Sequence, residues 1–315
     1  MHAVLLTAAL PGWAASSYPT KPIRFIVPFT PGGSQDVIAR LVGQKVVERV
    51  GQQVVIDNRT GAAGLIAAEL TARAAPDGYT LFMATAGPVT IAQSLQPKLA
   101  YQPTKDFAPV IHLVDTPMAL IAANALPAKS VTELLTLAKA KPGSLNYASV
   151  GNGSISHLTM ELFKQQTAIS MTHVPYKGAV PAFVDLSSGQ VQTMFITTAA
   201  AHPHVVAGRA RVLAVAARKR VASFSSTPTL GEAGVLGLEV PVWAGVLTTQ
   251  GVAKPVIDLL YKEMLATLQL PDVRQRLDQL GSEIVGDNPQ AFASVLAADF
   301  ARWAKVIKAA NLKLD

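Results

Sequence analysis

Three short loops rich in glycine and small polar residues are the best candidates for chemistry in this sequence of 315 residues. They are Thr30-Pro31-Gly32-Gly33-Ser34, Ala86-Gly87-Pro88 and Gly151-Asn152-Gly153-Ser154. Each follows a predicted strand and leads into a predicted helix. The start of a helix presents unpaired N–H groups and the positive end of the helix dipole, so it binds an anion without needing a Lys or Arg. Glycine lets that anion approach the backbone closely. Two such loops facing each other across a cleft would hold a small carboxylate, whereas an ordinary tight turn is the alternative for each.

Asp36, His157 and Lys177 lie next to these loops, and each has two interpretations. Asp36 falls in the first turn of a predicted helix, where a carboxylate stabilises the helix dipole by about 0.3–1 kcal/mol. The alternative is that Asp36 orders a ligand through water or pairs with a ligand amine. His157 lies about one turn into its predicted helix, and it either reaches the cleft or has a structural role. Lys177, in Tyr176-Lys177-Gly178 at the cleft edge, either attracts an anion or is simply solvated.

Sequence patterns that would indicate catalysis or metal binding are weaker than the three glycine-rich loops. Ser154 and His157 have a spacing that suggests a dyad, but no acid is evidently placed to orient the histidine, Gly-x-Ser-x-Gly is absent, and backbone capping explains Ser154 more simply. His202-Pro-His204 has no further spaced ligand and is more typical of a surface turn than of a metal site. No dinucleotide fingerprint, phosphate-binding Gly-Lys-Ser/Thr loop or cysteine occurs. The sequence therefore predicts a binding protein without cofactor or metal, and an α/β hydrolase is the remote alternative.

The first part of the chain alternates strands and helices. Apolar runs predict strands over 22–29, 53–57 and 79–85, and helical periodicity predicts helices over 36–50 and 65–74. This βαβαβ order is half of a doubly wound parallel sheet. In such sheets, ligands bind outside the carboxyl ends of the strands, where loops lead into helices.

One long extended stretch, FAPVIHLVDTPMALIAAN at 107–124, interrupts this alternation and is typical of a crossing between domains. A strand at 240–249 is predicted to return to the first domain. The other elements predicted after the crossing are strands at 145–149, 171–176, 191–197 and 211–217, and helices at 131–141, from 156, at 179–189, 254–268, 271–280 and 289–310. We therefore expect domain 1 to comprise 18–118 and 240–315, and domain 2, residues 119–239, to be inserted through two crossing strands.

Composition fits two α/β domains. The chain is longer than one typical core, and 50% of its residues are apolar while only 15% are charged, as expected for buried parallel strands. The net charge of +7 comes from scattered Lys and Arg with one short cluster at 218–220, so nucleic acid is not an expected partner.

AVLLTAAL at 3–10 is similar to the apolar segment of a secretory signal, which predicts a signal peptide over 1–17; a buried N-terminal strand is the alternative.

Six stretches taken in order resemble one family, the periplasmic solute receptors of tripartite tricarboxylate transporters, also called the Bug receptors. They are YPTKPIRFIVPFTPGGSQDVIAR, VVIDNRTGAAGLIAAE, PDGYTLFMATAG, NYASVGNGSISHL, VPYKGAVPAFVDLSSGQVQTMF and STPTLGEAG. They extend from about residue 18 to 234, and the C-terminal part fits more loosely. A single motif of this kind is weakly specific, but six in sequence are specific.

The resemblance implies a type II periplasmic binding protein, a hinged Venus flytrap in which each lobe is a doubly wound, mainly parallel sheet with flanking helices. It implies a periplasmic, monomeric receptor that captures a small organic anion (a dicarboxylate, an amino acid or an aromatic acid) and delivers it to membrane permease subunits. A ligand-dependent sensor partner of a histidine kinase is the alternative function. The residues expected to bind the ligand on this basis are Phe29, Thr30, Gly32, Gly33, Asp36, Ala86, Gly87, Ser149, Gly151, Ser154, His157, Tyr176 and Thr197.

Overall fold

The computed structural model describes residues 18–96 and 98–309. The predicted signal peptide, residues 1–17, lies outside these ranges. Within them, no helix combines the length and the apolar character that a bilayer crossing requires.

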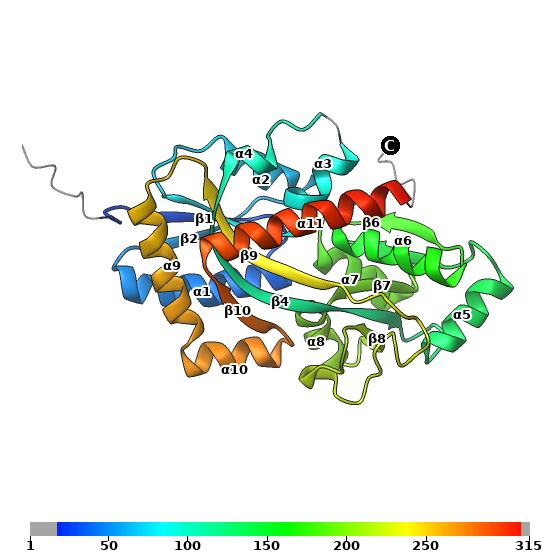
Figure 1. Cartoon of the computed structure of the whole chain (residues 1–315). Coiled ribbons are helices and arrows are strands. Elements are labelled where there is room, and N and C mark those ends of the chain that lie inside the picture. The colour runs from blue at the N-terminus through cyan, green and yellow to red at the C-terminus, as the bar shows by residue number, and fades with distance from the viewer. Residues whose placement is uncertain (1–17, 97, 310–315) are drawn as a thin grey trace, which may run out of the picture.

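Two α/β lobes share one continuous mixed sheet (Figure 1), whose main strand order is β2-β1-β3-β9-β4-β7-β5-β6. The first lobe is built around β1 (Ile23–Val27), which pairs in parallel with β2 (Val54–Asn58) and β3 (Thr80–Ala84). Its helical segments are α1 (Ser34–Val50), η1 (Ala62–Gly64), α2 (Leu65–Ala72), η2 (Gly87–Ile91), α3 (Ala92–Leu95) and α4 (Pro103–Asp106).

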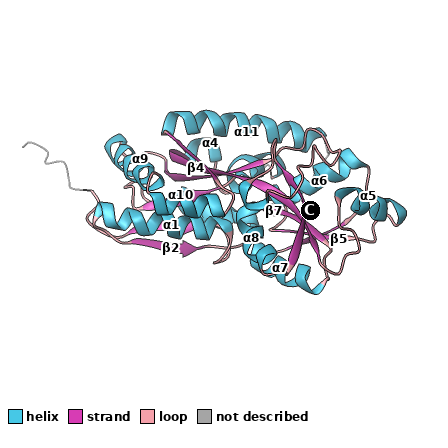
Figure 2. Cartoon of the chain, turned by 90° about the horizontal axis from the view of Figure 1, so that it is seen from below, coloured by secondary structure: helices cyan, strands magenta, loops and turns pink. Residues whose placement is uncertain are grey.

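The second lobe repeats this plan around β5 (Asn146–Ser149), which pairs in parallel with β6 (Thr172–Pro175) and β7 (Thr193–Thr197). Its other elements are α5 (Val131–Ala140), α6 (Ile155–Thr167), α7 (Ala179–Ser188), α8 (Thr198–Val206), β8 (Ala210–Ala216) and η3 (Ala222–Phe224). Helices cover both faces of the sheet (Figure 2). The predicted fold class is confirmed, with parallel strands in each lobe and antiparallel strands between them.

Two long strands connect the lobes. β4 (Phe107–Ala123) runs antiparallel to β9 (Pro241–Thr249) up to Pro117, and from Met118 onward it pairs with β7 and β8 instead. The stretch predicted as one extended crossing is therefore a single strand that changes partners between Pro117 and Met118. The chain then completes the first lobe with α9 (Lys254–Leu268), α10 (Pro271–Gln279), β10 (Glu283–Asp287) and α11 (Pro289–Ala309).

The apolar core on one face of the sheet is continuous through both lobes. It joins Phe82 of β3 to Tyr147 of β5, and α11 covers it with Phe292 and Trp303. In Figure 1, α11 runs along β9 and β4 from the first lobe toward α6. The long C-terminal helix thus seals the core over the crossing strands.

Gly245 of β9 packs directly beneath α11, and alanine does not fit there. A Cβ at this position would collide with the Phe292 ring and would lie 2.8 Å from the Ile111 carbonyl oxygen. We expect Gly245→Ala to lower the free energy of unfolding by about 2 kcal/mol, because added atoms in a packed core force backbone shifts. Urea unfolding followed by circular dichroism measures this. Gly231→Ala is the control, since its Cβ would meet no atom closer than 3.7 Å; equal midpoints for the two variants would contradict the prediction.

Two of the segments that differ from the sequence prediction lie in the later part of the chain. β10 was not predicted, and His202-Pro-His204, predicted as a surface turn, lies inside α8. The Thr197 hydroxyl caps that helix, and the His204 ring stacks on Phe183 with ring centres 3.6 Å apart. Pro203 removes only one backbone hydrogen bond from a helix that these contacts stabilise.

Candidate functional site

A small cavity lies between the lobes, where several helices begin. Its volume is about 30 Å³, room for two or three water-sized groups. The residues that line it at helix starts are Gly33, Ser34 and Gln35 of α1, Ser154, Ile155 and Ser156 of α6, Ala179 of α7 and Thr197 of α8. No described residue that lines it is charged. The positive ends of four helix dipoles therefore converge on a space that contains no ionised side chain.

The four helix starts differ in how they are capped. At α6 the Ser154 hydroxyl accepts a hydrogen bond from the His157 N–H, and at α8 Thr197 accepts one from Ala200. α1 and α7 begin after Gly33 and Gly178, which have no side chain with which to cap the first amides. The first turns of α1 and α7 are thus suited to an anionic ligand as the acceptor.

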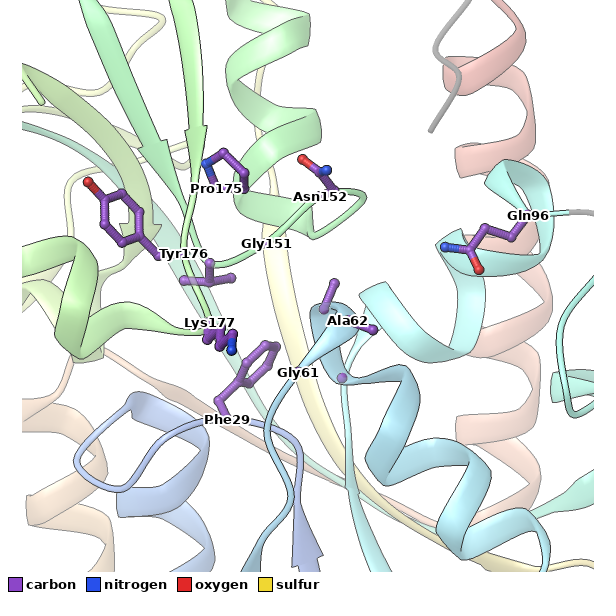
Figure 3. Close-up of a pocket in the computed structure, with 12 residues that line it drawn as sticks. Phe29, Gly61, Ala62, Gln96, Gly151, Asn152, Pro175, Tyr176 and Lys177 are labelled. Atoms are coloured by element: carbon purple, nitrogen blue, oxygen red, sulfur yellow. The ribbon is translucent and has the colours of Figure 1, made fainter. Parts of the chain in front are cut away.

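A larger cavity of about 290 Å³ adjoins the first, and Phe29 and Val150 line both. Figure 3 shows that loops from both lobes surround it, with Gly61 and Ala62 on one side and Gly151, Asn152 and Pro175 on the other. Lys177 is the only charged side chain among the described residues that line it. The two adjoining cavities therefore offer a small solute one compartment without charged side chains and a second compartment that contains the cation Lys177.

The loop Gly61–Gly64 has an unusual backbone. All four residues have positive φ, at 119° for Gly61, 47° for Ala62, 53° for Ala63 and 95° for Gly64. Left-handed conformations at non-glycine residues store strain and cluster at binding sites. This loop was missed in the sequence prediction, although it follows a strand and precedes a helix like the other three loops.

Asp36 lies behind the first loop and lines neither cavity. Its carboxylate, in a residue only 2% exposed, accepts hydrogen bonds from the Gly32 N–H, the Arg40 Nε and the Asn58 Nδ2, each at 2.9 Å. Burial alone would raise the pKa of Asp36, but hydrogen bonds from Arg40, Gly32 and Asn58 outweigh burial and lower the pKa below its ordinary value. Asp36 therefore holds the loop in shape from within.

The structure divides the predicted ligand-binding residues into two groups. Those that line one or both cavities are Phe29, Gly33, Gly87, Gly151, Ser154, Tyr176 and Thr197. Those that line neither are Thr30, Gly32, Asp36, Ala86, Ser149 and His157. Further lining residues that the prediction did not single out for ligand contact include Ser34, Gln35, Thr85, Gln96, Asn152 and Pro175.

The predicted residues have different roles around the lining. Ser149 is fully buried and bonds to both backbone groups of Gly151. The Thr30 hydroxyl oxygen is buried, with no hydrogen-bond partner among the described residues. Tyr176 does line the larger cavity, but its hydroxyl donates to Asp185 at 2.5 Å, and in Figure 3 its ring points away from the other labelled residues.

The two lobes touch around the cavities. A Cβ on Gly151 of the second lobe would lie 3.3 Å from the Cα of Ala63 in the first. On Gly178 it would lie 2.8 Å from the Thr30 hydroxyl oxygen, and on Gly32 it would lie 3.8 Å from a Val180 methyl group. Glycine at 151 and 178 permits this close approach, and the two lobes are in a closed arrangement.

Ser154 and His157 do not form a catalytic dyad. The Ser154 hydroxyl donates to the Gly151 carbonyl at 2.7 Å, and the His157 Nδ1 accepts from the Gly153 N–H at 3.1 Å. Both polar groups stabilise the loop, and neither side chain activates the other. The pairing on which the hydrolase alternative depends is therefore not formed.

Comparison with known proteins gives a consistent picture. The family model described as the tripartite tricarboxylate transporter family receptor matches residues 38–312. Protein BugT of Bordetella pertussis is 34% identical over 302 residues, which is 96% of this chain and 93% of that protein.

Solved structures agree with the sequence comparisons. An R. palustris protein solved with adipate superposes with a TM-score of 0.92 at 37% identity, covering 94% of this chain and 99% of its own. MatC from Rhodopseudomonas palustris, with bound malate, has a TM-score of 0.88 at 33% identity, covering 92% of this chain and 100% of its own.

Proposed function

The chain belongs to the tripartite tricarboxylate transporter family of receptors, and from this premise we propose that it binds a small dicarboxylate between its two lobes. It is a solute receptor and not an enzyme. The observation that carries the proposal is the convergence of α1, α6, α7 and α8 on one small cavity without charged side chains. A carboxylate has three heavy atoms, which is about what a volume of 30 Å³ admits.

One carboxylate of the solute lies in the small cavity. Hydrogen bonds from N–H groups to a charged acceptor contribute about 1.5–3 kcal/mol each, and helix dipoles in a partly buried site contribute up to about 2 kcal/mol. The uncapped starts of α1 and α7 supply one set of donors from each lobe. The same anion therefore bridges the lobes and stabilises their closed arrangement.

The rest of the solute extends into the larger cavity, where Lys177 attracts its second carboxylate. Two relatives support this, because the ligands named with them, adipate and malate, are both dicarboxylates. A cavity of about 290 Å³ is at the lower end of the range for small-molecule sites, which favours a short-chain acid.

Delivery of the solute requires that the two lobes close on it. We propose that residues 18–118 with 240–315 and residues 119–239 move as the two lobes, with the hinge where β4 changes partners at Pro117 and Met118. The closed form docks on membrane permease subunits, and the receptor works in the periplasm.

Thermal unfolding with a panel of acids at pH 7.5 tests the proposal. A dicarboxylate such as adipate or malate is expected to raise the melting temperature, since a ligand at a hundredfold excess over Kd adds about 2.7 kcal/mol of stability. Calorimetric titration then gives the stoichiometry, expected to be one solute per chain. A melting curve unmoved by every dicarboxylate in the panel would refute the solute class.

Replacing Lys177 tests the second compartment. Lys177→Met is expected to weaken the binding of adipate about tenfold and to leave hexanoate, which lacks the second carboxylate, unchanged. Titration calorimetry measures both affinities. Lys105→Met is the matched control, because it removes the same charge from an exposed site on α4 that lines neither cavity. An equal loss for the two acids would show that Lys177 does not recognise the second carboxylate.

A further inference from the structure

A stack of aromatic and imidazole rings lies directly behind the Gly151–Ser154 loop. The rings of His157 in α6 and His173 in β6 are stacked and nearly parallel, with an angle of 8° between their planes and their centres 3.9 Å apart. The Tyr147 ring of β5 lies beside both imidazoles, with its centre 4.8 Å from that of His173 and 6.4 Å from that of His157. Both histidines are withdrawn from the cavities, and neither takes part in the solute contacts proposed above.

Each imidazole is hydrogen-bonded to the loop or to its anchor. The His157 Nδ1 accepts from the Gly153 N–H at 3.1 Å. The His173 Nε2 lies 2.6 Å from the Ser149 hydroxyl, which in turn bonds to the Gly151 N–H at 3.2 Å and to its carbonyl at 3.1 Å. The two imidazoles therefore fix both glycines of a loop that closes on Ala63 of the opposite lobe.

The bond from Gly153 requires a neutral His157. A nitrogen that accepts an N–H bond carries no proton of its own, so the single ring proton of His157 is on Nε2. A second proton would have to go to Nδ1, where it would face the Gly153 N–H as one donor against another. Protonation of His157 is thus incompatible with the observed position of the loop.

Several charged and titratable groups surround this pair. Glu161 of α6 lies 4.0 Å from the His157 Nε2, accepts a hydrogen bond from the Tyr147 hydroxyl and pairs with Lys164 at 2.7 Å. Burial lowers the pKa of His157, and Lys164 adds to this while Glu161 opposes it. Burial also lowers the pKa of His173 to about 3, assisted by His157 itself. Both imidazoles are therefore neutral at pH 7.

We propose that His157 and His173 are positioning residues for the solute site, and that acidification releases the Gly151–Ser154 loop and weakens solute binding. The inference rests on the proposed function, since it concerns a loop that lines the proposed site. Solute affinity would then depend on pH through two residues that do not touch the solute, and the solute contacts alone would not produce this dependence.

The direction of the pH effect follows from the lowered pKa values. Well above the ordinary histidine value of 6.5, both imidazoles are neutral in every state, so their protonation does not make affinity vary with pH there. Below it, the released loop takes up protons that the ordered loop excludes, and the apparent affinity falls by at most about tenfold per pH unit for each proton taken up. Affinity is therefore highest near neutral pH and decreases toward pH 4.5.

Two substitutions at position 157 separate positioning from simple packing. His157→Phe keeps a flat ring but has no acceptor, so the Gly153 N–H loses its partner and affinity for adipate is expected to fall about tenfold at pH 7.5. His157→Asn carries an oxygen at nearly the place of Nδ1 and does not titrate. It is expected to restore most of the affinity that the Phe variant loses and to flatten the pH dependence.

The readout is the ratio of wild-type to His157→Asn affinity between pH 7.5 and 4.5, measured by calorimetry. The solute's own protonation affects both proteins and cancels in this ratio, which is expected to fall about tenfold. His204→Asn is the control, because that half-buried histidine stacks on Phe183 away from the site and its loss should leave the profile unchanged. A ratio that stays constant with pH, or a Phe variant that binds like wild type, overturns the inference.

A measurement without solute keeps this test independent of the proposed function. The amide resonance of Gly153 in ¹⁵N-labelled, ligand-free protein is expected to shift with pH in the wild type and to stay constant in His157→Asn. Failure of every acid to bind would refute the proposed function while leaving this result intact. A Gly153 amide that is insensitive to pH in the wild type would overturn the inference even if dicarboxylates bind.

Discussion

Gly87→Val is expected to weaken dicarboxylate binding at least a hundredfold, a loss of about 2.7 kcal/mol in binding free energy. Gly87 lines the small cavity, and its backbone has no left-handed φ, so its backbone conformation is open to a larger residue. A Cβ there would lie 3.8 Å from the Cα of Ser154 across the cleft. The two further carbons of valine would then fill a space of only about 30 Å³. Calorimetric titration with the tightest acid of the panel measures the loss.

The same variant should fold normally, because the nearest obstacle to its Cβ is the Ala63 carbonyl oxygen at 3.3 Å, which a small shift relieves. Gly231→Val provides a matched control, since Gly231 also lies outside the left-handed region and is remote from both cavities. Wild-type affinity in a folded Gly87→Val protein would show that the carboxylate lies somewhere other than this cavity.

Asp36→Ala is expected to lower the free energy of unfolding by about 3 kcal/mol and the melting temperature by roughly 5–10 °C. The substitution leaves the Gly32 N–H and one Asn58 N–H without their acceptor in a buried place. Because the folded pKa of Asp36 is lowered, its contribution is fully present above the ordinary value of 3.8 and is lost as pH falls through the folded value. Thermal unfolding at pH 7 and at pH 3 measures both effects, and the wild-type advantage should shrink at pH 3.

A second aspartate serves as the control for this prediction. Asp258 also pairs with a cation four residues away, Lys254, but both side chains are more than half exposed. Asp258→Ala should therefore change stability by less than about 1 kcal/mol. Similar melting temperatures for the Asp36 and Asp258 variants would mean that the buried Asp36 carboxylate does not stabilise the fold more than an exposed ion pair does.

Apolar periodicity in the sequence predicts most of the helices and strands of the fold. The helices predicted at 254–268, 271–280 and 289–310 are α9, α10 and α11 to within one residue, because their apolar spacing and flanking Pro residues are local signals. β10 was missed since its five residues, EIVGD, are too short and polar to stand out. Pro203 concealed α8, whose stability comes from contacts with Phe183 that are distant in sequence.

The candidate site was predictable as a set of loops, and less so as a set of side chains. Strand-to-helix junctions rich in glycine identified Gly33, Gly87, Gly151 and Ser154 correctly as neighbours in space. The direction of a side chain depends on tertiary partners instead. Asp36 turns inward because Asn58 of β2 is there to bind it, and no local pattern around residue 36 contains that information.

The apolar core that α11 covers determines how the protein unfolds. Phe82, Tyr147, Trp243 and Trp303 belong to one apolar cluster, so neither half of the receptor has a complete interior of its own on that face. Heat or denaturant should therefore melt the whole chain cooperatively, and the inserted half should not persist as an independently folded fragment. The hinge proposed at Pro117 and Met118 therefore lies within a single thermodynamic unit, in which the two lobes unfold together.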